Sequence, residues 1–148
     1  MNTILDTVGK TPLLRLNRIV SPVSCSVWGK LESRNPGGSV KDRIGINMIR
    51  TAEKSGRLRP GMTIVEPTSG NTGIALSMVA AALDYSLILI MPDNMSLERR
   101  QVMLSYGATL ETTPAKDDMI GAINRAEEIV NSAPNKYFMP QQFDNQSN

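Results

Sequence analysis

Short strand-like runs alternate with helix-period patterns along most of the chain, and this alternation limits the available folds more than any other feature. The run LILIM at 87–91 is apolar at every position, which is typical of a strand that is buried on both faces. Repeated strand–helix units at this spacing predict an α/β fold, with a parallel sheet flanked by helices and joined by right-handed crossovers. The expected strands are 26–32, 63–66, 87–91, 109–113 and 137–139, and the expected helices are 41–54, 72–83, 96–105 and 117–132.

Several helices have recognisable ends or faces. Ser96 is placed to cap the N-terminus of the 96–105 helix, and Gly107 follows its end. The 72–83 helix is apolar on nearly every side, so we expect it to be buried. The 117–132 helix is amphipathic, and its expected buried face is Met119, Ile120, Ile123, Ala126 and Val130.

Composition excludes several kinds of chemistry. The 148 residues include no histidine and one cysteine, Cys25, which removes Ser–His and Cys–His pairs and most catalytic zinc sites. We therefore expect no metal site and no internal disulfide. Aromatic residues make up only 4% of the chain, so we expect no nucleic-acid partner. No apolar run approaches the ~20 residues that span a bilayer, and no secretory signal is evident, so we expect a cytoplasmic protein that does not enter a membrane.

The first loop with chemical potential is NPGGSVKD at 35–42. Its two glycines permit backbone angles that are closed to other residues. The spacing of Ser39 and Asp42 predicts a capping box. Lys41 then lies in the first turn of a helix, where the macrodipole disfavours a cation and favours the nucleophilic neutral amine. A lysine that is merely solvated beside a capping box is the alternative, and this motif alone leaves both readings open.

A second loop, PTSGNTG at 67–73, follows the 63–66 strand and begins the apolar helix. Backbone N–H groups, hydroxyls and an asparagine amide meet there at a helix N-terminus, which suits an anion. The loop fits neither G-x-G-x-x-G nor G-x-x-x-x-G-K-[ST], so a nucleotide is a poor match. A phosphate, a carboxylate or a merely structural turn stay open. Together the two loops suggest a carbonyl cofactor held as a Schiff base beside a carboxylate substrate.

The same two loops carry a family resemblance. NPGGSVKDRIG at 35–45 and EPTSGNTGIAL at 66–76 resemble the fold-type II pyridoxal-phosphate enzymes, and within them the cysteine synthase (O-acetylserine sulfhydrylase) family. The resemblance covers essentially the whole chain. Further similar segments are TPLLRLNR (11–18), MPDNMSLERR (91–100), YGATLETTP (106–114), GAINRAEEIV (121–130) and QQF (141–143).

The resemblance implies roles for particular residues. Lys41 would carry pyridoxal 5'-phosphate as an internal aldimine and later remove the α-proton of the substrate. Asn71 would bind the ring hydroxyl oxygen of the cofactor. In the family reaction, O-acetylserine loses acetate to give an aminoacrylate, which sulfide attacks to form cysteine. The substrate α-carboxylate would be held by Thr68, Ser69, Gly70, Thr72 and Gln142.

The resemblance also implies a domain plan of the tryptophan-synthase-β-like type. Residues 1–46 would belong to a large domain, and residues 47–148 would form the small mobile domain that carries the substrate loop. Family members are about twice this length, so the rest of the large domain, with its phosphate loop, would be absent. We therefore expect the chain alone to fold in part and to be inactive. The apolar residues Leu13, Leu14, Val27 and Trp28 would then be exposed, reorganised or covered by another chain, so we expect oligomerisation or mobility in that segment.

Two departures from the family pattern stand out. Asp118 occupies a position where the family usually has glycine, and the last four residues, NQSN, lack the proline of the family's N-P-A-N.

Other readings remain within and outside this chemistry. A cystathionine β-synthase or a serine/threonine dehydratase would use the same cofactor. An inactive fragment that binds the C-terminal peptide of serine acetyltransferase is the non-enzyme alternative, since in the family the same carboxylate loop receives that peptide. The full-length form would be a homodimer.

Overall fold

The computed structural model describes residues 2–18 and 25–148. At its centre lies a four-stranded parallel sheet in the order β5–β4–β3–β6. Register pairs such as Val65 with Ile88 and Ile88 with Thr109 align the neighbouring strands. The fold class expected from the strand–helix alternation is confirmed. The strand bounds are β3 Thr63–Pro67, β4 Ser86–Pro92, β5 Thr109–Thr113 and β6 Tyr137–Phe138.

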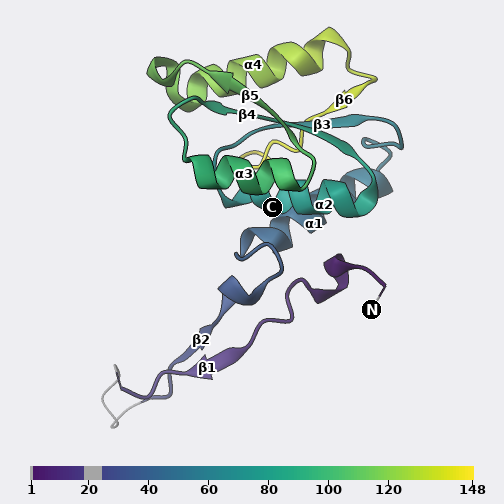
Figure 1. The fold of residues 1–148 in the computed structure, drawn as a ribbon. Helices are drawn as coiled ribbons and strands as arrows, with labels where there is room; N and C mark the ends of the chain where they lie inside the picture. The colour runs from purple at the N-terminus through teal and green to yellow at the C-terminus, as the bar shows by residue number, and fades with distance from the viewer. Residues whose placement is uncertain (1, 19–24) are drawn as a thin grey trace.

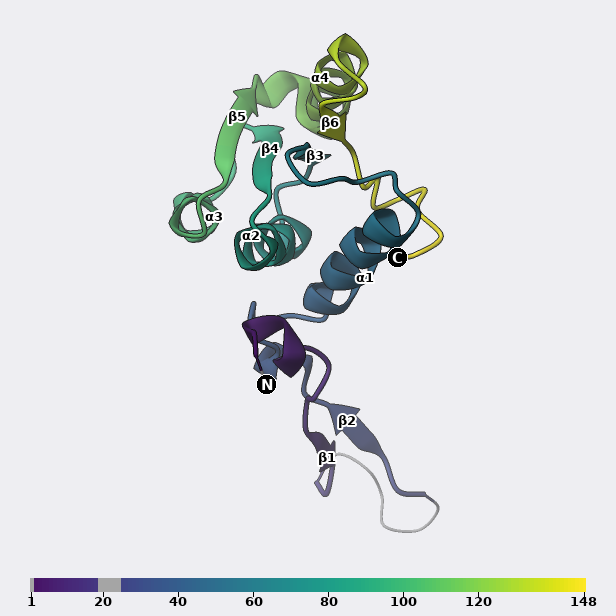
Figure 2. The same ribbon diagram turned by 90° about the vertical axis from the view of Figure 1, so that its right-hand side faces the viewer.

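Helices cover both faces of this sheet. Helix α4 (Asp118–Ser132) lies on one face, while α2 (Asn71–Leu83) and α3 (Leu97–Ser105) lie on the other (Figures 1 and 2). Helix α1 (Lys41–Lys54) packs against α2 and lies farther from the sheet (Figure 2). All four helices fall where the apolar periodicity placed them, within one residue at each end.

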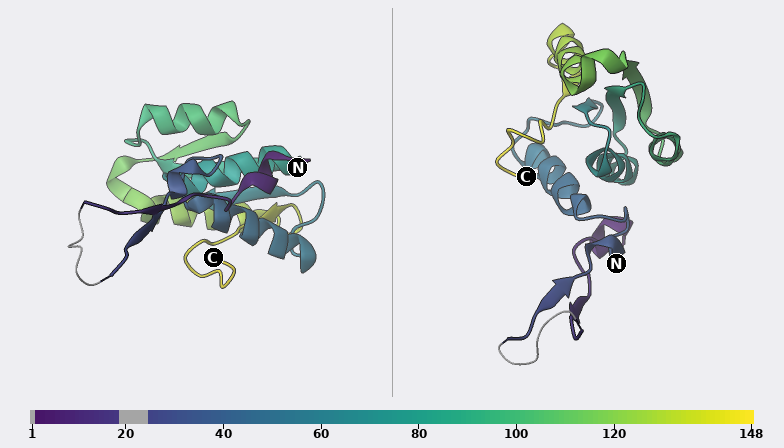
Figure 3. Two further views of the ribbon diagram at one scale, coloured as in Figure 1. Left: turned by 90° about the horizontal axis from the view of Figure 1, so that it is seen from below. Right: turned by 90° about the vertical axis from the view of Figure 1, so that its left-hand side faces the viewer.

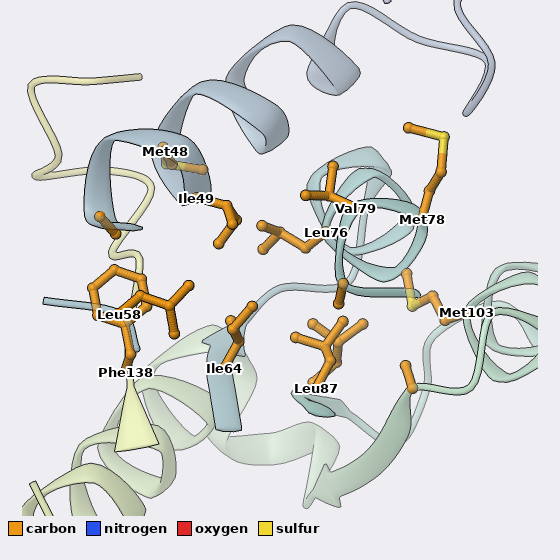
Figure 4. Close-up of a cluster of buried hydrophobic side chains, with 14 of the residues drawn as sticks. Met48, Ile49, Leu58, Ile64, Leu76, Met78, Val79, Leu87, Met103 and Phe138 are labelled. Carbon is orange, nitrogen blue, oxygen red and sulfur yellow. The ribbon is translucent and has the colours of Figure 1, made fainter. Parts of the chain in front are cut away.

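The core follows the alternation of side chains along the strands. Ile64 of β3 belongs to the cluster on the α1–α2 side, whereas its neighbour Val65 belongs to the cluster beneath α4. In β4 the side chain of Leu89 joins the first cluster and that of Ile90 joins the second. The larger cluster, shown in Figure 4, includes Met48, Ile49, Leu58, Leu76, Val79, Leu87, Met103 and Phe138.

The N-terminal part extends away from the sheet as an antiparallel hairpin (Figure 1). It consists of β1 (Leu13–Arg15) and β2 (Trp28–Lys30), flanked by short 3₁₀ turns at Ile4–Thr7 and Glu32–Arg34. Its apolar side chains face solvent, since Leu13 is 58% and Trp28 52% exposed. Leu14 and Val27 are exposed as well. Exposure is one of the expected outcomes for this segment, and covering by another chain stays a prediction. Sequence analysis missed β1.

One face assignment was wrong. Ile120 was expected on the same face of α4 as Ala126, but it is 70% exposed, whereas Ala126 is buried together with Ala122. Ile120 therefore lies outside the face of α4 that packs on the sheet.

The end of the described chain returns to α1. The side chain of Asn47 donates to the backbone oxygen of Ser147 at 2.7 Å, and the C-terminal end lies beside α1 in both views of Figure 3. The expected domain boundary between residues 46 and 47 falls inside this helix and stays a prediction. Within the described part of the chain, no helix combines the length and the apolar character needed to cross a membrane.

Candidate active site

The first loop is held by a buried asparagine. Asn35 is 4% exposed, and its oxygen accepts the Gly9 N–H at 2.8 Å. Its amide nitrogen donates to the backbone oxygens of Glu32 and Ser39, both at 3.0 Å, and to the Glu32 carboxylate at 2.8 Å. One side chain thus joins the N-terminal segment, the 3₁₀ turn before the loop and the loop itself.

The predicted capping box was wrong in its partners. Ser39 Oγ accepts the Lys41 N–H at 3.1 Å, and Asp42 turns back to accept the Gly37 N–H at 2.6 Å. A Cβ at position 37 would collide with the Asp42 carboxylate, so the loop needs glycine there. Asp42 is fully buried, and burial raises its pKa while the Gly37 N–H opposes that shift and the charge of Glu32 adds to it.

An ion pair ties α1 to the N-terminal segment. Arg43 donates to both oxygens of Glu32 at 2.8 Å and to the Gly9 backbone oxygen at 3.0 Å. The Arg43 guanidinium, followed by the Thr11 hydroxyl, lowers the pKa of Glu32 to about 2. Asp42 and Arg43 therefore shape the loop and the start of α1 through bonds within the chain. Lys41, which lies between them, is half-buried at the first residue of α1.

The second loop begins α2 directly after β3. Its Thr68 N–H donates to Ile90 of β4 at 3.0 Å, which fixes where the loop leaves the sheet. Thr68 and Thr72 are buried, whereas Ser69 and Gly70 are partly exposed and Asn71 is exposed. No atom lies within 4 Å of the place a Cβ would take at Gly70. The backbone at the start of α2 is therefore open to a ligand.

Two contacts show that α1 and α2 run in the same direction. Near their N-termini they meet at Gly45 and Ala75, where a Cβ on the glycine would lie 3.1 Å from Ala75 Cβ. At their far ends Tyr85, just after α2, donates to Glu53 of α1 at 3.1 Å.

This direction brings the two loops to the same end of the helix pair. Lys41 precedes Gly45 by four residues, and Asn71 precedes Ala75 by four residues. Each is therefore one turn from the close contact and on the same side of its helix as the contact residue. The N-terminal ends of both helices, with Lys41 at one and Asn71 at the other, thus lie on the side of this contact.

Gln142 is tied to the end of β3, directly before the second loop, by a residue that sequence analysis missed. Glu66, at the end of β3, is 1% exposed and accepts the N–H groups of Gln141 and Gln142, both at 2.9 Å. Burial raises the pKa of Glu66 to about 7, against the lowering effect of those two N–H groups. Sequence analysis could have identified Glu66, because a glutamate in a largely apolar strand directly before the second loop is unusual.

The comparisons with known proteins agree with this geometry. Residues 4–148 match the family described as "Pyridoxal-phosphate dependent enzyme". The chain belongs to this family. The cofactor of this enzyme family is pyridoxal phosphate. The residues that match the family model include both loops and Gln142.

Individual relatives are similar over the same range. The chain is 56% identical over 142 residues to a cysteine synthase A of Escherichia coli (strain K12), which covers 96% of this chain and 43% of that protein. A cysteine synthase of Staphylococcus aureus (strain N315) is 48% identical over the whole chain and 47% of its own length. The chain thus spans a little under half the length of the curated relatives it matches.

Solved structures of a cysteine synthase and a related enzyme are also similar to this chain. The crystal structure of cysteine synthase from Entamoeba histolytica matches with a TM-score of 0.95 and 43% identity, over 99% of this chain and 45% of that one. An O-acetylserine dependent cystathionine beta-synthase from Helicobacter pylori matches with a TM-score of 0.88 and 38% identity, over 99% of this chain and 48% of that one. The fold of the described residues is therefore that of the corresponding part of these two enzymes.

The residues present fit one side of the cofactor. A primary amine at Lys41 and an amide at Asn71 belong to the first residues of α1 and α2, and the backbone at Gly70, directly before Asn71, is open. These groups suit the aldehyde carbon and the ring hydroxyl oxygen of pyridoxal phosphate. The roles of Lys41, Asn71, Thr68, Ser69, Gly70, Thr72 and Gln142 stay predictions.

Proposed function

We propose that these residues form the lysine-bearing and substrate-binding part of a pyridoxal-phosphate-dependent cysteine synthase, which converts O-acetylserine and sulfide to cysteine and acetate. The observation that carries the proposal is the placement of Lys41 and the Thr68–Thr72 loop at the same end of the α1–α2 pair. The similarity to cysteine synthases supports the choice of substrates.

Each residue has a chemical task in this proposal. When bound, pyridoxal phosphate supplies an electron sink for the substrate α-carbon. Lys41 would hold the cofactor through its amine, and the free Nζ would take the α-proton of the substrate. Asn71 orients the cofactor ring by a hydrogen bond to its hydroxyl oxygen.

The second loop binds the substrate carboxylate. It presents N–H groups and hydroxyls at a helix N-terminus, and 67–73 contains no basic side chain. A singly charged carboxylate suits such donors better than a phosphate dianion does. The Gln142 amide supplies a further donor from the segment after β6. A fixed carboxylate orients the α-carbon toward Lys41, which is where positioning accelerates the proton transfer.

The 148 residues alone supply only part of the site in this proposal, since the relatives are about twice as long. We expect cysteine formation by the isolated chain to be near background and to rise when the complementary part of the Escherichia coli relative is added. Sulfide-dependent cysteine production measures this directly. Turnover by the isolated chain at the rate of an ordinary enzyme would contradict the need for a second part.

A second candidate activity is supported by the similarity to the O-acetylserine dependent cystathionine beta-synthase. That enzyme class uses the same cofactor chemistry with a larger thiol. Comparing sulfide with homocysteine as second substrate in the completed protein separates the two, because faster turnover of homocysteine would favour the second.

The remaining parts of the proposal rest on the family resemblance. They are a homodimer for the full-length form, a cytoplasmic location, and binding of the C-terminal peptide of serine acetyltransferase at the carboxylate loop. Peptide binding by a chain that takes up no cofactor would favour the binding-module alternative over the enzyme.

A further inference from the structure

Glu66 is a buried carboxylate whose bonds reach a distant part of the chain. Its Oε2 accepts the Gln141 N–H and its Oε1 accepts the Gln142 N–H, each at 2.9 Å. Both oxygens are therefore used to hold one dipeptide that lies 75 and 76 residues later in the sequence. The glutamate itself is followed directly by the Pro67 that begins the second loop.

The dipeptide needs such a restraint. Gln141 has a φ of +55°, the left-handed conformation that is unfavourable for residues other than glycine. The turn that follows adds two bonds, because the N–H groups of Asp144 and Asn145 both donate to the Gln141 oxygen at 3.0 Å. Without an acceptor for its own N–H, Gln141 would lose a bond that offsets the cost of this conformation.

We propose that Glu66 is a positioning residue of the amino-acid site, because its carboxylate fixes the backbone from which the Gln142 amide reaches the substrate carboxylate. The inference rests on the proposed function, in which Gln142 binds the substrate. Glu66 itself touches the Gln141–Gln142 backbone and acts through it.

Only an ionised carboxylate suits this arrangement fully. It offers acceptor positions on both oxygens, whereas an amide or a protonated acid turns one side into a donor that faces an N–H. Burial brings the pKa of Glu66 to about 7. The other charged groups around the cavity of about 70 Å³ beside it are Glu127 of α4 and Asp144, both acidic. The hold on Gln142 therefore strengthens as the pH rises through neutrality.

The experiment compares Glu66→Gln, Glu66→Asp and a matched control, Glu127→Gln, which changes an exposed carboxylate of the same cavity. Hydrogen exchange of the Gln141 and Gln142 amides is measured by NMR in the 148-residue protein at pH 8. We expect exchange to accelerate by about tenfold or more in Glu66→Gln, because the amide turns one of the two N–H acceptors into a donor. The acceleration should be smaller in Glu66→Asp, which keeps a carboxylate. Glu127→Gln should match the wild type.

The second measurement is the affinity for L-serine, which carries the amino and carboxylate groups of O-acetylserine. It is made by calorimetry with pyridoxal phosphate and the complementary part present. We expect about tenfold weaker binding in Glu66→Gln, partial recovery in Glu66→Asp, and an affinity that falls in the wild type, but not in Glu66→Gln, as the pH drops below 7.

The two measurements separate the possible failures. Unchanged amide exchange in both Glu66 variants overturns the inference, and so does accelerated exchange with unchanged L-serine affinity. A wild-type protein that binds no L-serine contradicts the proposed function, and with it this inference. Circular dichroism identifies a variant that does not fold, in which case Glu66→Asp carries the comparison.

Discussion

The loops that begin α1 and α2 lie at the same end of the helix pair but are built in opposite ways. Around the first loop, Asn35 and Arg43 bond to other parts of the chain and Asp42 bonds to Gly37 within the loop, so the loop is held by bonds inside the protein. The second loop is fixed at its base, through Thr68 to β4, and its Gly70 backbone is open. The difference suits the roles proposed for them, a rigid support for the cofactor-bearing lysine and an accessible surface for a substrate that binds and leaves.

The largest expected effect is on the first loop. Lys41→Ala should remove the visible cofactor absorbance and lower cysteine formation by the completed protein by about 10³-fold or more, because both attachment and proton transfer are lost. Lys54→Ala, at the other end of α1, is the control. Borohydride reduction followed by peptide mass analysis locates the attachment, and a pyridoxyl group on Lys30 or Lys54 would refute the assignment.

Removing the internal support of the first loop tests its rigidity. Asn35→Ala should lower the free energy of unfolding by about 2–4 kcal/mol, because it deletes several bonds of a buried side chain and leaves partners unsatisfied. Urea unfolding measures this change, with the exposed Asn47→Ala as control. Equal stability of the two variants would show that the first loop is not held through Asn35.

A substitution in the second loop should weaken ligand binding and change the free energy of unfolding only a little. Ser69→Ala should weaken amino-acid binding about five- to tenfold, as expected for one lost hydrogen bond to a charged group, while cofactor retention stays the same. A spectral titration with L-serine in the completed protein gives the affinity, and Ser105→Ala in α3 is the control. Loss of cofactor at unchanged amino-acid affinity would reverse the roles assigned to the two loops.

The pH dependence of stability reports on Glu66 behind the second loop. Its pKa is about 7 in the folded protein against an ordinary 4.5, because burial penalises the ionised form more than its bonds to the Gln141 and Gln142 N–H groups favour it. The fold is therefore more stable relative to the unfolded chain while Glu66 is protonated. This contribution is complete below pH 4.5 and is lost as the pH rises through 7. In urea unfolding, wild-type stability relative to Glu66→Gln should fall between pH 5 and 8. A constant difference would show that Glu66 does not titrate there.

The smallest expected effect concerns Asp118, a strained residue directly before one that contacts the second loop. Asp118 has φ 46° and ψ −150°, a region that suits glycine, and the next residue, Met119, contacts the Ser69 hydroxyl through its sulfur at 3.9 Å. Asp118→Gly should stabilise the protein by about 1 kcal/mol by relieving this strain. Asp117→Gly, at an ordinary φ of −90°, should be neutral or destabilising. Equal changes in thermal stability would contradict the strain.

The sequence by itself determined the regular elements and the chemical types at the two loops. Helix and strand periods depend on residues close in the chain. The bounds of α1 could therefore be predicted directly, and those of the LILIM strand to within one residue at each end. The positions of Lys41 and of the Thr68–Thr72 loop at helix starts followed for the same reason.

Only the tertiary structure decided which polar groups face each other. The partner of Asp42 proved to be Gly37 and not Ser39, because burial and a tight glycine turn outweighed the local capping pattern. The exposure of Ile120 and the hold of Glu66 on Gln141 and Gln142 depend on residues far apart in the chain. Such pairings arise when the strands are assembled into a sheet, and no local pattern records them.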